Sequence, residues 1–82
     1  MGSFQYVIKD EVGMHARPAG MLVKLAKELS SAVTITKGDR TVEATKLLAI
    51  MSLGVKKGEE TTVSADSEED LEKLKKFFEE NL

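Results

Sequence analysis

Hydrophobic and polar residues alternate in four short stretches of the chain. In the first stretch, Phe4, Tyr6 and Ile8 share one face of an extended backbone, and the residues of the other face are mostly polar. A period of two is typical of a half-buried β-strand. Residues 37–40, Lys-Gly-Asp-Arg, form a tight-turn signal between the second and third stretches. The predicted strands are residues 4–9, 33–36, 41–43 and 61–65.

Three other stretches carry apolar residues at helical spacing. The first begins at Pro18 and continues through Leu22, Ala26 and Leu29. The last follows Ser67, a favoured N-cap residue, and opens with acidic residues. The predicted helices are residues 16–29, 45–54 and 68–82. Since every strand has one mostly polar face, the element order predicts an α+β domain of two layers, with the helices on one face of a four-stranded antiparallel sheet.

Composition narrows the classes of protein that this chain can represent. With 82 residues it forms one small domain, residues 1–82, with a single core. The net charge of −2 gives no support to nucleic-acid binding, and the absence of cysteine excludes disulfides, thiolate metal sites and thiol catalysis. The longest apolar run, residues 47–51, is too short for membrane insertion, and no secretory signal is evident. We therefore expect a cytoplasmic protein.

Candidate chemistry is concentrated in the stretch Gly13-Met14-His15-Ala16-Arg17-Pro18-Ala19, which holds the only histidine and the only proline. Because Pro18 suits the first turn of a helix, His15 takes the N-cap position. The unpaired N–H groups from Ala16 onward and the charge of Arg17 then predict a phosphate-binding site beside the imidazole. A lone histidine at such a junction is more often a solvated cap, but its combination with glycine, arginine and proline favours a phosphoryl-accepting histidine.

Two surfaces next to this stretch are candidates for partner binding. Along the first predicted helix, Lys24 and Lys27 follow Arg17 and Gly20 on one face and form a basic row that suits acidic partner surfaces. A row of this kind is, however, often an ordinary solvated face. The second helix is apolar on nearly every side and too short to bury all of its side chains, so we expect an exposed apolar patch rather than five core residues.

The stretch around His15 resembles the active-site signature of the HPr family, the histidine-containing phosphocarriers of the bacterial phosphoenolpyruvate-dependent sugar phosphotransferase system. Residues 46–54 resemble the second helix of that family. The resemblance implies an open-faced sandwich with strand order 1-4-2-3 and three helices on one face.

The resemblance also implies a function. His15 would accept a phosphoryl group at Nδ1 from phosphorylated enzyme I and pass it to an enzyme IIA component of a sugar transporter, with Arg17 assisting. Such a chain is a monomeric phosphotransfer intermediate rather than a stand-alone enzyme, and it needs no metal and no cofactor beyond the phosphoryl group that phosphoenolpyruvate supplies through enzyme I. The partner-binding residues implied are Arg17, Gly20, Lys24, Lys27, Leu47, Leu48 and Met51.

One position departs from many HPr relatives. Where they have a serine that an ATP-dependent regulatory kinase phosphorylates, this chain has Lys46, so we expect no regulation there. Thr45 is the predicted N-cap of the second helix and an alternative phosphosite. Two other functions stay open: a paralogue in the nitrogen-related phosphotransfer branch, and a regulatory binding domain on the same fold. His15 speaks against the second, since such relatives lack the histidine.

Overall fold

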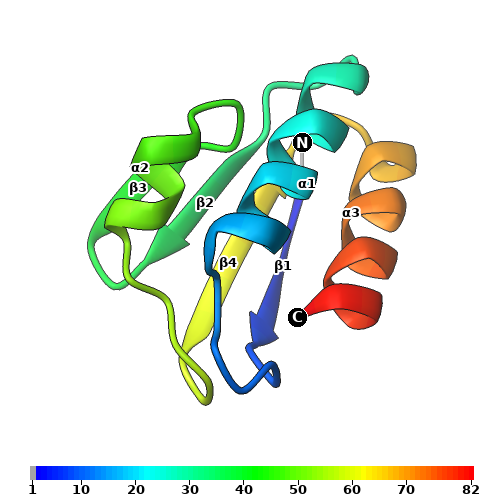
Figure 1. Cartoon of the computed structure of the whole chain (residues 1–82). Helices are drawn as coiled ribbons and strands as arrows, with labels where there is room; N and C mark the ends of the chain where they lie inside the picture. Colours follow the sequence, from blue (N-terminus) through cyan, green and yellow to red (C-terminus); the bar gives the residue numbers. More distant parts are fainter. Residues whose placement is uncertain (1) are drawn as a thin grey trace.

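The computed structural model describes residues 2–82 and arranges them as seven helices and strands (Figure 1). The strands pair in the order β1-β4-β2-β3, and every neighbouring pair is antiparallel. The predicted α+β class and strand order are therefore confirmed. The elements are β1 (Gly2–Val7), α1 (Ala16–Glu28), β2 (Thr34–Lys37), β3 (Arg40–Glu43), α2 (Leu47–Ser52), β4 (Glu60–Ala65) and α3 (Glu68–Asn81).

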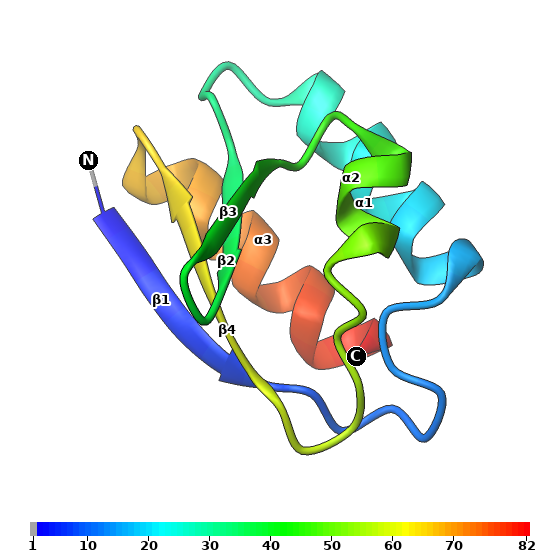
Figure 2. The ribbon, with the colours of Figure 1, turned by 90° about the vertical axis from the view of Figure 1, so that its left-hand side faces the viewer.

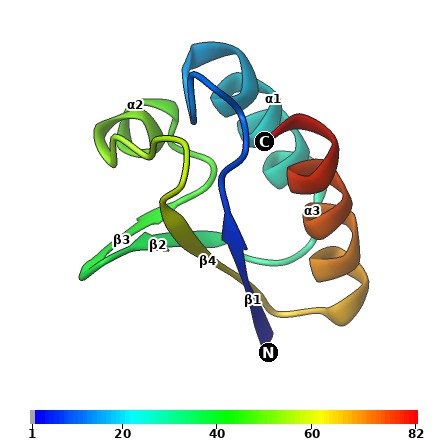
Figure 3. The ribbon, with the colours of Figure 1, turned by 90° about the horizontal axis from the view of Figure 1, so that it is seen from below.

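The three helices lie on one face of the sheet, as the view from below shows (Figure 3). The opposite face is polar: the register aligns Gln5, Thr62, Thr36 and Thr41 in one row across the four strands. Within this row the hydroxyl groups of Thr36 and Thr41 are 2.8 Å apart and share a hydrogen bond. Such alternation is what a sheet covered on one side requires, and it confirms the two-layer prediction.

The core fills the space between the sheet and the helices. Phe78 of α3 is fully buried, and three aromatic rings meet it edge-on at centroid distances of 5.8, 5.5 and 6.0 Å; they belong to Phe4, Tyr6 and Phe77. Each fully buried large apolar side chain stabilises the fold by about 1.5–3 kcal/mol. The other large apolar side chains that are almost completely buried are Ile8, Leu22, Ile35, Ile50, Val63 and Leu74.

The second helix is shorter than predicted, and its N-cap is a different residue. The chain leaves β3 through a turn in which Lys46 N–H donates to the Glu43 carbonyl, 3.1 Å away. The Lys46 carbonyl then accepts the first helical hydrogen bond, from Ile50 N–H at 3.0 Å. The prediction that Thr45 is the N-cap was wrong, because Thr45 lies inside the turn and Lys46 occupies the cap. At the other end, Gly54 with φ of 62° follows Leu53 and ends the helix.

Candidate functional site

The loop between β1 and α1 delivers His15 to the surface, and it lies against the loop that precedes β4 (Figure 2). Met14 N–H donates to the Val55 carbonyl at 3.0 Å. Gly13 has φ of 80° and packs so closely that a Cβ there would collide with the same carbonyl oxygen. Only glycine meets both conditions without strain. The backbone immediately before His15 is therefore fixed by residues that lie far away in the sequence.

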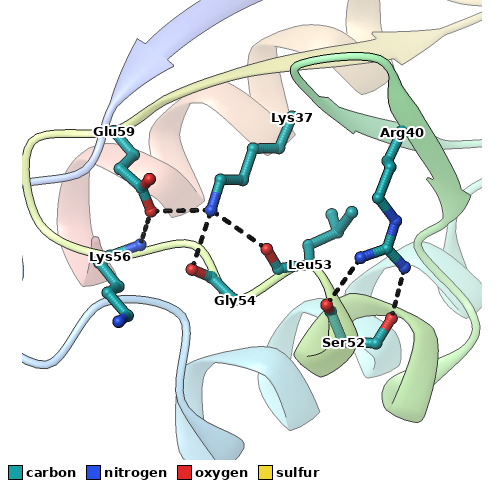
Figure 4. Close-up of polar contacts among 7 residues, drawn as sticks. All are labelled: Lys37, Arg40, Ser52, Leu53, Gly54, Lys56 and Glu59. Atoms are coloured by element: carbon teal, nitrogen blue, oxygen red, sulfur yellow. Dashed lines mark hydrogen bonds and ion pairs between the residues drawn. The ribbon is translucent and has the colours of Figure 1, made fainter.

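Lys37 and Glu59 hold the supporting loop in place (Figure 4). The Lys37 ammonium donates to the carbonyls of Leu53 and Gly54 at 3.2 and 3.1 Å, and it pairs with Glu59 Oε1 at 3.0 Å. The same carboxylate oxygen accepts a hydrogen bond from Lys56 N–H at 2.7 Å. These bonds, that of Lys37 first, lower the pKa of the Glu59 carboxyl. Lys37, at the end of β2, thus joins the end of α2 to the segment on which the His15 loop rests.

A second contact fixes the end of α2 against the β2–β3 hairpin. The Arg40 guanidinium donates to the Ser52 carbonyl at 2.9 Å and to its hydroxyl at 3.1 Å (Figure 4). The Ser52 hydroxyl in turn donates to the Ala49 carbonyl at 2.7 Å. Since cations favourably contact the free carbonyls at a helix end, Lys37 and Arg40 together stabilise this short helix in its position.

Asp10 orders the His15 loop from the other side. Its Oδ1 accepts hydrogen bonds from Val12 N–H at 2.8 Å and from Gly13 N–H at 3.2 Å. Its own backbone N–H donates to the carbonyl of Leu82 at 2.8 Å, beyond the end of α3. The loop therefore has an internal anchor as well as contacts with two distant segments.

His15 is the N-cap of α1, as predicted. Its backbone is extended, with φ of −88° and ψ of −175°, and its carbonyl accepts a hydrogen bond from Ala19 N–H at 3.0 Å. Within the described residues the imidazole makes no capping hydrogen bond, and the first turn of α1 carries no acidic side chain. His15 as a whole is half-buried, at a helix start whose first N–H groups, those of Ala16 and Arg17, have no partner within the helix.

The imidazole lines a shallow pocket of about 160 Å³ together with Arg17 and Pro18. Three further residues of this pocket were not predicted: Asp10, Met21 and Asn81. Asp10 has a local signal, an aspartate three residues before a glycine, which favours a side-chain-to-backbone turn. Asn81 comes from the end of α3, and no pattern in the sequence links it to His15. The volume suits a small group such as a phosphoryl group.

The structure exposes the side chains predicted to contact partners. Leu48 of α2 is 81% exposed, and Leu47 and Met51 are 38% and 39% exposed, whereas Ile50 and Leu53 are buried. The apolar patch is therefore real, and we define it as Leu47, Leu48 and Met51. On the adjacent α1, Arg17, Lys24 and Lys27 are exposed and Gly20 is partly covered. Met21 is 43% exposed on the same helix. That these residues bind partners stays a prediction.

Within residues 2–82, no helix has both the length and the apolarity to cross a bilayer.

Comparison with known proteins gives a consistent result. The model of the family described as "PTS HPr component phosphorylation site" matches residues 3–80. The chain is 38% identical over 66 residues to the phosphocarrier protein HPr of Mycoplasma capricolum, a match covering 80% of this chain and 74% of that protein.

Solved structures with the same fold include a mycoplasmal histidine-containing phosphocarrier protein, with a TM-score of 0.87 and 32% identity, covering 93% of this chain and 90% of that one. They also include the Bacillus subtilis catabolite-repression protein Crh, a domain-swapped dimer, with a TM-score of 0.75 and 33% identity, covering 100% and 98%.

Proposed function

The chain belongs to the PTS HPr family, and from that premise we propose that it carries phosphoryl groups on His15 between phosphorylated enzyme I and an enzyme IIA component of a sugar transporter. One observation carries the proposal: His15 occupies the N-cap position of α1, but its imidazole makes no capping hydrogen bond and shares a pocket with Arg17. A ring kept free at a positively polarised helix start is available to a phosphorus atom.

The proposed reaction needs little from the protein beyond position and charge. The lone pair of the His15 Nδ1 attacks phosphorus, the new P–N bond forms, and the bond from phosphorus to the donor breaks. The N–H groups of the first turn and the Arg17 guanidinium face the phosphoryl oxygens and stabilise their charge. Transfer to the acceptor reverses these steps, so the carrier itself is regenerated.

Docking of both partners is proposed to use the apolar patch and the basic residues of α1. The patch supplies apolar area next to the pocket, and its methionine adapts to partners of different shape. Lys24 and Lys27 extend the positive charge of Arg17 along α1, which suits acidic partner surfaces. We propose that the carrier acts as a monomer in the cytoplasm, because both surfaces must be free for each partner in turn.

Regulation by phosphorylation at the start of α2 is proposed to be absent. The N-cap there is Lys46, which is exposed and has no hydroxyl group. A phosphoserine at this position would bring nearly two negative charges to the docking surface and repel acidic partners, whereas lysine attracts them. Thr45, partly covered in the preceding turn, is the neighbouring hydroxyl that a kinase assay must examine.

Incubation with enzyme I and phosphoenolpyruvate tests the proposal directly. Intact-mass measurement should find one added phosphoryl group that is labile in acid and stable in base, as is typical of phosphohistidine. His15→Ala should fold normally and gain nothing. A folded wild-type chain that accepts no phosphoryl group would overturn the proposal and favour a regulatory binding domain, the role that the similarity to Crh raises.

The docking surface can be tested with one matched pair of variants. Leu48→Glu should raise the KM for enzyme I about tenfold or more, the size of a hot-spot contact, and leave stability nearly unchanged. Val7→Glu, which alters another exposed apolar residue on the open face of the sheet, should leave the KM unchanged, although it lowers stability slightly because Glu60 lies opposite it. Equal effects of the two substitutions would remove the apolar patch from the docking surface.

A further inference from the structure

The pocket around His15 holds a negative as well as a positive charge. Arg17 was predicted from the sequence, but Asp10 lines the same pocket and comes from the other side of the loop. A phosphoryl group adds between one and two negative charges at neutral pH. Arg17 therefore favours the phosphorylated form, and a carboxylate in the same small pocket opposes it.

The same carboxylate also determines the shape of the loop. Its Oδ1 accepts from the two consecutive N–H groups of Val12 and Gly13, which places Gly13 against the Val55 carbonyl and His15 at the helix start. Asn can form the same turn with its side-chain oxygen, because only an acceptor is required. Charge and hydrogen bonding at position 10 are thus separable by mutation.

We propose that Asp10 is a positioning residue of the His15 loop whose charge also destabilises the phosphorylated state of the pocket. The inference rests on the proposed function, and it adds a property to it: the carrier gives up its phosphoryl group more readily than a pocket with Arg17 alone would. When the P–N bond to His15 forms and the bond to the donor breaks, the transferred oxygens approach Asp10, and the repulsion is relieved when the group leaves.

Three variants separate the two roles of Asp10. Asp10→Asn keeps the acceptor and removes the charge, and Asp10→Ala removes both. Glu11→Gln is the control for net charge, because Glu11 is highly exposed, pairs with Lys57 at 2.7 Å and is not among the residues lining the pocket. All three are incubated with enzyme I at a fixed ratio of phosphoenolpyruvate to pyruvate until the phosphorylated fraction is constant.

If the charge of Asp10 destabilises the phosphorylated state, the equilibrium between phosphorylated and free carrier should change when that charge is removed. For Asp10→Asn the ratio of phosphorylated to free carrier should rise about fivefold at low salt, and less at high salt, because one unit of repulsion is removed from a partly screened pocket. Glu11→Gln should leave the ratio unchanged. An unchanged ratio in Asp10→Asn, or an equal rise in Glu11→Gln, would overturn the electrostatic role.

If Asp10 positions the His15 loop, the order of that loop should depend on the hydrogen-bond acceptor at position 10. Amide exchange of Val12, whose N–H donates to Asp10 Oδ1, should accelerate in Asp10→Ala and stay slow in Asp10→Asn, and the rate of phosphoryl uptake should fall in Asp10→Ala only. Gly13 N–H is the internal control, because it also donates to the backbone carbonyl of residue 10 at 3.1 Å, which every variant keeps. Normal exchange and uptake in Asp10→Ala would overturn this role. A wild-type protein that accepts no phosphoryl group overturns the proposed function, and the inference with it; a wild-type protein that does accept one makes the comparison of variants decisive for Asp10 alone.

Discussion

Two helix starts in this small domain are built in opposite ways. At the start of α3, the Ser67 hydroxyl accepts a hydrogen bond from Asp70 N–H at 3.3 Å, and all three residues of the first turn are acidic. At the start of α1, the His15 side chain caps nothing and the first turn has no acid. The free N–H groups of the first turn are thus capped by the chain's own side chains in α3, whereas those of α1 are left without a side-chain cap.

The difference separates stability from function. N-cap side chains and first-turn acids pair with the free N–H groups and compensate the helix dipole. This stabilises the helix but leaves no free donors for a ligand. At α1 the N–H groups and Arg17 remain available to an external anion. The open helix start therefore carries a cost in stability, and substitutions that make α1 resemble α3 should increase stability while removing activity.

The largest effect is expected from His15→Ser, which gives α1 the same cap residue as α3. The variant should lose acid-labile phosphoryl uptake completely, because no ring nitrogen remains. Its free energy of unfolding should rise by about 1 kcal/mol if the hydroxyl accepts from the first turn. Intact mass and denaturant unfolding measure the two quantities. An unfolding midpoint below that of the wild type would show that α1 was not lacking a cap.

Arg17→Glu makes the first turn of α1 acidic and is expected to have the next largest effect. Phosphoryl uptake should slow by about a hundredfold or more, since a charge that stabilises the transferred group is replaced by one that repels it. The acid should at the same time stabilise the helix start by about 0.3–1 kcal/mol. Lys24→Glu, the same change of charge farther along α1, is the control and should affect partner binding more than the chemical step. An equal loss in both variants would argue against a special role for Arg17.

The sequence predicted the local motif of the site but not the distant residues that approach it. His15, Arg17 and Pro18 are consecutive or nearly so, and a helix start is a local feature, so a short motif was enough. Asn81 and the Val55 carbonyl approach this motif only because the chain folds back on itself. Patterns of neighbouring residues in one sequence do not indicate contacts between segments that are far apart in the chain.

The fold shows the same division. Alternation and helical spacing predicted all seven elements, but the strand order followed from the resemblance to a family and not from periodicity. Thr45 was misassigned as an N-cap because threonine is a favoured cap residue, and that preference was outweighed by the turn that joins β3 to α2. An exposed apolar patch on α2 was predictable, since a helix of this length cannot bury every side chain, but its member Leu48 was named from the resemblance to the family.

At the closed helix start, Asp70→Ala should destabilise the protein without affecting phosphoryl uptake. The buried carboxylate accepts hydrogen bonds from the Ser31 hydroxyl at 2.6 Å and from Ser31 N–H at 3.1 Å, so its loss leaves two partly buried donors without this acceptor. We expect the melting temperature to fall by roughly 5 °C. Asp70 lies about 16 Å along α3 from Asn81 of the His15 pocket, which is why uptake should be unchanged. Slower uptake in this variant would show that the start of α3 affects the His15 pocket, contrary to the separation of the two helix starts.

The same residue predicts a pH dependence. The hydrogen bond from the Ser31 hydroxyl, more than any other contact, lowers the pKa of the Asp70 carboxyl in the folded protein. A group with a lowered folded-state pKa stabilises the fold fully above its unfolded value, about 3.9, and loses that contribution as the pH falls through the folded value. The stability difference between wild type and Asp70→Ala should therefore be constant near neutral pH and narrow below about pH 4. A difference that stayed constant in acid would show that the charged form of Asp70 is not what matters.

Ser67→Ala should give the smallest effect and is the most specific probe of capping. It removes the hydrogen bond from Asp70 N–H to the Ser67 hydroxyl but leaves Glu68, Glu69 and Asp70 in place. The free energy of unfolding should fall by about 1 kcal/mol, because Asp70 N–H loses its partner at a position that water partly reaches. Phosphoryl uptake should not change. Combining Ser67→Ala with His15→Ser moves the cap from one helix to the other, and since the two sites are far apart their effects on stability should add and nearly cancel. A double variant much less stable than the wild type would mean that the start of α1 cannot accept a cap, and that His15 is held there by the loop rather than by the needs of the helix.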